Sequence, residues 1–386
     1  MFSDGDGPSG SSGAASRAPT DKFKAVRKAS PNDKIVLYLF GREFMDNATT
    51  PPSIDGVILV DPTYASGSNR QVYVQMVIIF GRKGDPKAEI DFEHQFCTKT
   101  LSLECSQVYP VKREIEKTSR QEALITKLGE FAFPFRIDFP KLGAPSYQMM
   151  QGSRDEQSNL GLEYEVMAFV GEDEFDEHKR SSAKMAVWRV QALPPTLNLT
   201  GQMPKGQRSK SFMMYSGAVN IDLSLDKPMY STDDQIKVDV NIANTTSKEI
   251  TDVKVKLCQR NQIPMFTDDG SHDITVQKVE DKVHIPQGGK LAREYTLTTC
   301  LPRRATAAES SWKYGQVMLE GTIGRDGKEI LAASTHINHS IQMRDLYGIY
   351  VEYVVKVKCT FGGTPGETVA EAAFILTQKE ESKKDA

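Results

Sequence analysis

A cluster of basic side chains near the start of the chain offers the clearest candidate chemistry in the sequence. Between Arg17 and Glu43, seven Lys and Arg residues stand against three acidic residues, whereas the whole chain carries a formal net charge of -3. Guanidinium and ammonium groups bind phosphate through charge-assisted hydrogen bonds. The local excess of positive charge therefore favours an anionic partner, although a solvated basic edge strand would show the same pattern.

Two strands joined by a tight turn would position these basic residues. The pair Arg27 and Lys28 precedes a Ser-Pro-Asn-Asp sequence at 30–33, which is typical of a turn because Pro and Asx residues set its backbone. The segment 35–40 is apolar or aromatic at every position, which predicts a strand buried on both faces. It ends on Gly-Arg-Glu at 41–43, whose charges must be paired or hydrated beside a buried strand.

The residue patterns of common enzyme classes do not occur. No GxSxG motif is present, and the segment 201–206 is followed by Gln207 and Arg208 instead of the Lys-Ser/Thr pair of a phosphate-binding loop. His336 and His339 are close, but no acidic or Cys residue lies at ligand spacing, so no metal and no cofactor are expected. Interleaved Tyr, Phe and Lys would suit nucleic-acid stacking, but β-sheet cores need the same residues. A binding protein without nucleic-acid partners is therefore favoured over an enzyme.

Composition sets the broad class and the compartment. At about 150 residues per domain, a chain of 386 residues predicts two or three domains, of which we favour two. The 48 Lys and Arg nearly balance the 51 Asp and Glu, and the five cysteines are odd in number and scattered, which is typical of a reduced, intracellular protein. The N-terminus has no signal-peptide pattern, and no apolar run approaches the roughly 20 residues that span a bilayer. We therefore expect a cytoplasmic protein without a transmembrane segment.

Short strand-like runs separated by turns fill the chain and fall into two halves. The runs at 54–62 and 71–80 predict neighbouring strands. A Pro- and Gly-rich stretch at 193–210 has no periodicity and is typical of a linker, after which the order strand, turn, loop, strand recurs. This pattern predicts an all-β protein of two tandem β-sandwiches. The expected boundaries are a disordered leader at 1–20, a first domain at 21–192, the linker at 193–210, a second domain at 211–378 and a short charged end at 379–386.

One amphipathic helix is expected among these strands, at SRQEALITKLG. Ser119 and Glu122 match a capping box, and Gly129 supplies a terminating residue. About ten residues are too few for a stable isolated helix, so its apolar face must lie on a sheet, near the basic strand. That face carries Leu124, Ile125 and Leu128.

Several segments resemble the arrestins, specifically the visual and β-arrestin branch. They are KASPNDKIVLYLFGREFMD, IDGVILVDPTY, QEALITKLGEFAFPF, GLEYEVMAFV, HKRSSAKMAV, SLDKPMYSTDDQIKVDVNIANTT and YVVKVK, in the family's order over residues 22–378. The resemblance implies two tandem immunoglobulin-like β-sandwiches and an adaptor that binds activated, phosphorylated G-protein-coupled receptors, opsins included, and ends G-protein signalling. It implies recruitment from the cytoplasm to the plasma membrane or photoreceptor membrane, and inositol phosphates are a further candidate ligand. A non-receptor, cargo-sorting scaffold of the same fold is the alternative.

The resemblance also implies roles for individual residues. Arg27 and Lys28 fall on paired phosphate-sensing positions, Arg42 on a phosphate-binding arginine, and Lys127 on a helix lysine that assists it. Leu124, Ile125 and Leu128 lie on the face that resembles the family's helix contact with the first strand. The receptor-binding loop corresponds to Gly81, Arg82, Lys83, Gly84, Asp85, Pro86 and Lys87. The sequence Gly-Asp-Pro-Lys-Ala replaces its usual apolar tip, so deep insertion into the receptor core is not expected.

The family's polar core, a set of buried charges that holds the resting state, is altered in this sequence. Its acids correspond to Glu43, Glu320 and Asp326, but its arginine position holds Trp188, with Arg189 alongside. Side chains alternate along a strand, so we expect Arg189 to point away from this core, unless a local shift turns it inward. The resting state would then be weakly held, with reduced discrimination between phosphorylated and unphosphorylated receptors. The family's regulatory C-terminal tail is expected to be missing, so clathrin binding is not supported.

Overall fold

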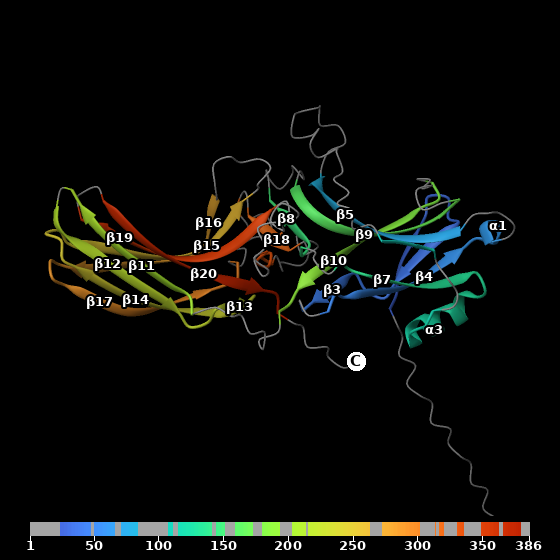
Figure 1. The fold of residues 1–386 in the computed structure, drawn as a ribbon, viewed down its shortest axis with the longest axis horizontal. Coiled ribbons are helices and arrows are strands. Elements are labelled where there is room, and N and C mark those ends of the chain that lie inside the picture. Colours follow the sequence, from blue (N-terminus) through green and yellow to red (C-terminus); the bar gives the residue numbers. More distant parts are fainter. Residues whose placement is uncertain are drawn as a thin grey trace, which may run out of the picture.

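The computed structural model shows an elongated molecule in which two β-sandwiches lie end to end (Figure 1). Strands dominate it, which confirms the predicted all-β class. The structure describes residues 24–47, 50–65, 71–83, 107–110, 115–140, 144–150, 159–172, 180–193, 203–213, 215–262, 272–301, 313, 316–319, 330–335, 349–362 and 366–379.

The first sandwich packs a four-stranded sheet on a larger one. The small sheet has the order β1-β2-β4-β7, with strands β1 (Val26–Ala29), β2 (Ile35–Leu39), β4 (Ser53–Val60) and β7 (Ala132–Asp138). The larger sheet runs β18-β8-β9-β10-β3 and also contains β5 and β6. Its strands are β3 (Glu43–Asp46), β5 (Gln71–Lys83), β6 (Gln107–Pro110), β8 (Tyr147–Met149), β9 (Asn159–Gly171), β10 (Ala183–Gln191) and β18 (Val317–Leu319).

Strand β2 is buried along almost its whole length, as its apolar sequence predicts. By contrast, the prediction that 54–62 and 71–80 form neighbouring strands is wrong. A short helix, α1 (Pro62–Ala65), follows β4, after which β5 joins the other sheet beside β9. Both segments are apolar enough to be central strands, so their composition did not reveal that the chain changes sheets between them.

Helix α3 (Ser119–Leu128) is capped one residue earlier than predicted. Thr118 is the N-cap: its hydroxyl accepts a hydrogen bond from the backbone N–H of Gln121 at 3.3 Å, and the Gln121 side chain accepts one from the Thr118 N–H at 3.0 Å. The expected Ser119–Glu122 box is therefore wrong, because Ser119 already belongs to the first helical turn. Gly129, with φ at 93°, ends the helix as predicted.

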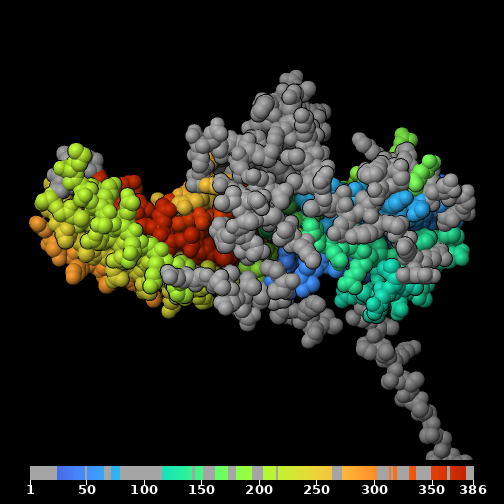
Figure 2. Space-filling model, in the orientation of Figure 1, coloured from blue at the N-terminus to red at the C-terminus, as the bar shows by residue number. Residues whose placement is uncertain are grey.

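Gln121 anchors this helix to the small sheet. The residue is 1% exposed, and its Nε2 donates to the carbonyl oxygens of Gly56 at 2.9 Å and Phe135 at 2.8 Å. The main packing partners of α3 are consequently β4 and β7, not the basic strand β1 as expected. Figure 2 shows the helix as a teal surface on the first sandwich.

The second sandwich pairs a four-stranded with a five-stranded sheet. The orders are β11-β12-β14-β17 and β13-β20-β19-β15-β16. Strand β14 alternates buried and exposed residues almost without exception, as expected for a strand with one face in the core. The strands are β11 (Lys205–Phe212), β12 (Tyr215–Leu225), β13 (Met229–Ser231), β14 (Gln235–Asn244), β15 (Ile250–Gln262), β16 (His272–Ile285), β17 (Lys290–Thr298), β19 (Tyr350–Phe361) and β20 (Glu367–Thr377).

Strand β18 joins the two sandwiches although it comes late in the chain. It pairs with β8 of the first sandwich, while Val317 exchanges two hydrogen bonds of 2.8 Å with the side chain of Gln259 on β15 of the second. The end of β20 makes a further connection, because the Gln378 N–H donates to the carbonyl of Gln191, at the end of β10, at 2.9 Å. Buried side chains form one continuous cluster across this junction.

Candidate functional site

The predicted phosphate-sensing pair lies on an exposed edge strand. Arg27 and Lys28 are both exposed on β1, which pairs only with β2 among the described strands. Exposed cations on such an edge can reach an anion without first being desolvated, and the edge also offers backbone groups to an extended peptide. The structure thus leaves this pair accessible, while its role as an anion site stays a prediction.

Arg42 lies against Trp188, which the resemblance described above predicts to stand at the core-arginine position. Its guanidinium carbon is 4.3 Å from the centre of the Trp188 ring, and its Nε donates to the Ala186 carbonyl at 2.7 Å. The two backbones are also linked, since Trp188 N–H donates to the Arg42 carbonyl at 2.6 Å. Trp188 is only 6% exposed and packs with Val190 and Leu319. An aromatic face thus holds this cation.

Arg189 forms a different buried ion pair, which the sequence did not reveal. The side chain is 2% exposed, and its guanidinium binds Asp46 on β3 and donates from Nη1 to the Pro140 carbonyl at 2.8 Å. It also lies 5.9 Å from the centre of the Phe139 ring, away from the Trp188 cluster. The alternation predicted for this strand is therefore what the structure shows. Asp46 ends one of the quoted segments, but it lies 143 positions from Arg189, so no pattern within one segment predicts this ion pair.

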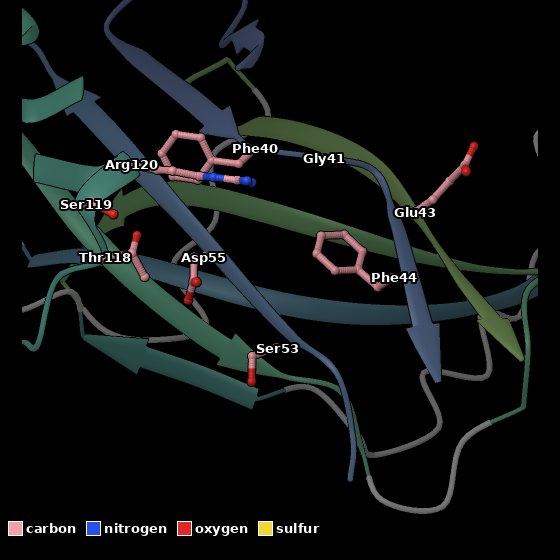
Figure 3. A pocket seen from close by; sticks show the side chains of 9 residues that line it. All are labelled: Phe40, Gly41, Glu43, Phe44, Ser53, Asp55, Thr118, Ser119 and Arg120. Atoms are coloured by element: carbon pink, nitrogen blue, oxygen red, sulfur yellow. The ribbon is translucent and has the colours of Figure 1, made fainter. Parts of the chain in front are cut away.

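Glu43 lies in register with Trp188, because β3 and β10 run parallel. It is exposed and contributes to the rim of a cavity of about 450 Å³. Figure 3 shows its carboxylate pointing away from the other lining side chains, with Phe40 and Arg120 at one end. The lining mixes two carboxylates with one guanidinium, so it does not form an anion site by itself. The cavity is lined by Phe40, Gly41, Glu43, Phe44, Ser53, Asp55, Thr118, Ser119 and Arg120.

The helix residues occupy the positions expected of an amphipathic helix. Leu124, Ile125 and Leu128 are partly buried, and Lys127 is exposed in the last turn. Lys127 therefore lies on a different element from Arg27, Lys28 and Arg42. That these four residues form one anion site remains a prediction.

Several predicted residues lie outside the described part of the chain. Gly81, Arg82 and Lys83 end strand β5, opposite β9, whereas Gly84, Asp85, Pro86 and Lys87 fall outside the described residues. So do the predicted core acids Glu320 and Asp326, the first of which directly follows β18.

Among the described residues, no group of His, Cys, Asp and Glu could hold a metal ion, and no helix is long and apolar enough to span a membrane.

A second basic surface, which we did not predict, lies on the outer face of the five-stranded sheet. Lys256 on β15 stands opposite Lys278 on one side and Lys356 on the other, and Lys254 stands opposite Lys358. Like charges placed directly opposite destabilise a sheet unless other charges compensate. Here acids compensate for most of the lysines: Lys254 and Lys278 share Glu280, Lys356 binds Glu371 at 2.7 Å, and Lys358 binds Glu367. The strand pairing that aligns these lysines could not be read from their separate sequences.

Comparison with known proteins matches both halves of the chain. The model described as arrestin (or S-antigen), N-terminal domain, covers residues 40–193, and the corresponding C-terminal-domain model covers residues 215–380. A relative named "Arrestin, lateral eye" from Limulus polyphemus is 33% identical over 362 residues, 92% of this chain and 85% of that protein. "Phosrestin-2" from Drosophila melanogaster is 32% identical over 368 residues, 94% of this chain and 96% of that protein.

Proposed function

The chain belongs to the arrestin family, and on this premise we propose that it is an adaptor that binds activated, phosphorylated G-protein-coupled receptors and ends their signalling. The observation that carries the proposal is the exposed pair Arg27 and Lys28 on β1, a strand that pairs only with β2 among the strands that the structure describes. An extended phosphorylated tail would meet both charge and backbone partners there. The proposal includes no enzymatic activity.

The relatives' names favour a sensory receptor within this class. One relative is named for the lateral eye, so we propose an opsin as the first receptor to test, with recruitment from the cytoplasm to the photoreceptor membrane. The alternative, a cargo-sorting scaffold of the same fold, would not require phosphate on its partner.

A pull-down separates these two functions. Matched receptor-tail peptides with and without phosphothreonines are immobilised, and binding of the full chain is measured at low and high salt. We expect retention on the phosphorylated tail, and weaker retention as salt screens the charges. Absence of binding at low salt would contradict the receptor proposal, and equal retention on both tails would favour the scaffold.

We also propose that inositol phosphates bind the lysine surface of the second sandwich. Lys256 lies between Lys278 and Lys356 on the neighbouring strands. Although Glu280 and Glu371 pair with these two lysines, a polyanion at Lys256 would also be attracted by both of them. Titration with inositol hexakisphosphate should show binding that weakens in Lys256→Gln. Equal affinity for the variant would place the ligand elsewhere.

A further inference from the structure

The cavity of about 450 Å³ lies where the start of α3 meets β3 and β4. Its volume falls within the range of small-molecule sites, ~300–1,000 Å³. Phe40 and Phe44 contribute two aromatic side chains to the lining, as Figure 3 shows. The ring of Phe44 packs on that of Phe139, with ring centres 5.5 Å apart, which holds it in place. The cavity therefore offers apolar contact to the body of a ligand.

The polar groups of the lining differ in how far the protein engages them. The Thr118 hydroxyl accepts the capping hydrogen bond of α3, and the Ser53 hydroxyl donates to Asp138. By contrast, the Oδ1 atom of Asp55 is shielded from solvent and has no hydrogen-bond partner among the residues that the structure describes. The Nε atom of Arg136 lies 3.7 Å from it, on a side chain that is 61% exposed. An ion pair with such an exposed partner compensates the Asp55 charge only weakly.

The position of Asp55 is also unfavourable for the folded state. Burial raises the pKa of its carboxyl, Asp138 adds to that effect, and Arg136 and Arg120 oppose it. The folded protein thus disfavours the charged form of this group. A charged group that lowers stability and lines a cavity is typical of a binding site, where function and stability conflict. The Asp55 side chain is 30% exposed, so a ligand has access to it.

The charges around the cavity favour a cation over an anion as its ligand. Glu43 and Asp55 belong to the lining, and Asp138 on β7 adds a third carboxylate. These three acids face the guanidinium groups of Arg120 and Arg136. Arg120 is itself exposed, so solvent and salt screen its repulsion of a bound cation.

We propose that this cavity binds a small organic amine, with the ammonium group on the Asp55 carboxylate and the apolar body against Phe40 and Phe44. The ammonium group supplies a charged hydrogen-bond donor at the accessible edge of the carboxylate. The site is independent of the receptor-binding function proposed above, because neither Arg27 nor Lys28 lines the cavity.

Calorimetric titration of the full chain with phenethylamine tests the site. Phenethyl alcohol is the matched control ligand, because it has the same aromatic body without the charge. We expect the amine to bind about tenfold or more tightly than the alcohol, as a charge-assisted contact requires. Binding of the amine should weaken from about pH 7 to about pH 4, because protonation removes the carboxylate charge. Equal affinities for the amine and the alcohol would overturn the proposal.

A variant of the carboxylate assigns the binding to this cavity. Asp55→Asn keeps the size of the side chain but removes its charge, so phenethylamine affinity should fall about tenfold or more. Asp222→Asn, an exposed acid on β12, is the control and should bind as the wild type does. Equal amine affinity for Asp55→Asn and the wild type would overturn the proposal.

Two further outcomes keep the test decisive. Absence of saturable phenethylamine binding up to about 10 mM, a weak affinity even for so small a ligand, would also overturn the amine site. Should Asp55→Asn fail to fold, as judged by circular dichroism, the comparison of the two ligands on the wild-type protein still decides.

Discussion

The Arg189 guanidinium donates two hydrogen bonds to one carboxylate oxygen of Asp46, from Nε at 2.8 Å and from Nη2 at 2.6 Å. Burial opposes the charge on Arg189, but neighbouring Tyr164 and Asp46 outweigh it and raise the pKa of the guanidinium. Arg189 therefore keeps its charge, and its contact with Asp46 ties β10 to β3. It lies on the opposite side of β10 from Trp188, so the strand carries two separate cation contacts, one on each face.

Removing Asp46 should cost the fold far more than removing an exposed acid. Asp46→Asn leaves the Arg189 charge buried without its anion, which we expect to lower the free energy of unfolding by about 3–5 kcal/mol. Urea denaturation measures this change. Asp222→Asn, on the exposed face of β12, is the matched control and should have little effect. Similar stability for the two variants would show that Asp46 does not hold Arg189 in solution.

Neutralising the basic pair on β1 should weaken phosphopeptide binding. A desolvated charge-assisted contact contributes about 1.5–3 kcal/mol, so Arg27→Gln with Lys28→Gln should reduce affinity roughly tenfold or more, and should also reduce its salt dependence. The control is Lys205→Gln with Arg208→Gln, an exposed basic pair on β11 of the second sandwich. An unchanged titration for the β1 variant would place the anion site elsewhere.

Restoring an arginine at position 188 should sharpen the dependence on phosphate. An arginine there would lie in register with Glu43; because Glu43 is exposed, an ion pair between the two would strengthen the resting state by only about 0–1 kcal/mol. Trp188→Arg should therefore increase the ratio of affinities for phosphorylated and unphosphorylated active receptor. If the wild-type protein already rejects the unphosphorylated form strongly and the substitution adds nothing, the idea of a weakly held resting state is wrong.

Asp55 and Asp61 should shift the pH dependence of stability in opposite directions. Burial raises the pKa of Asp55 against the pull of Arg136, so the folded state binds more protons there than the unfolded chain, and stability falls as pH rises through the raised pKa. Hydrogen bonds from Thr63 lower the pKa of Asp61, so its contribution is present at neutral pH and disappears in acid. Asp55→Asn should therefore stabilise the protein at about pH 7 but not at about pH 4, and Asp61→Asn should destabilise it only at the higher pH. Urea midpoints at both pH values measure these changes, and parallel shifts in the two variants would contradict the assignment.

The sequence predicted those features of the fold that depend on only a few consecutive residues. The apolar run of β2, the alternation in β10 and the helix end at Gly129 were predicted because each follows from spacing along one segment. The cap of α3 was missed by one residue because Thr118 and Ser119 are both good N-caps. The choice between them depended on Gln121, whose side chain is fixed by the carbonyl oxygens of β4 and β7.

The rest depended on pairings between distant segments. Asp46 and Arg189 meet only because β3 runs parallel to β10. The lysines of the second basic surface come together only because β15 pairs with both β16 and β19. The contact of Arg42 with Trp188 arises in the same way. No periodicity within one segment specifies which other segment lies beside it, so these parts of the candidate site required the structure.

The placement of β18 has a consequence for engineering hybrids of this protein. Three residues from the second half of the chain complete a sheet in the first half, and Gln259 ties them back to β15. If the chain is cut between Leu193 and Lys205, the two fragments should therefore stay associated until the protein is denatured. A hybrid that exchanges one sandwich for a relative's must keep β8 and β18 from the same parent, or the recombined halves will meet at mismatched surfaces.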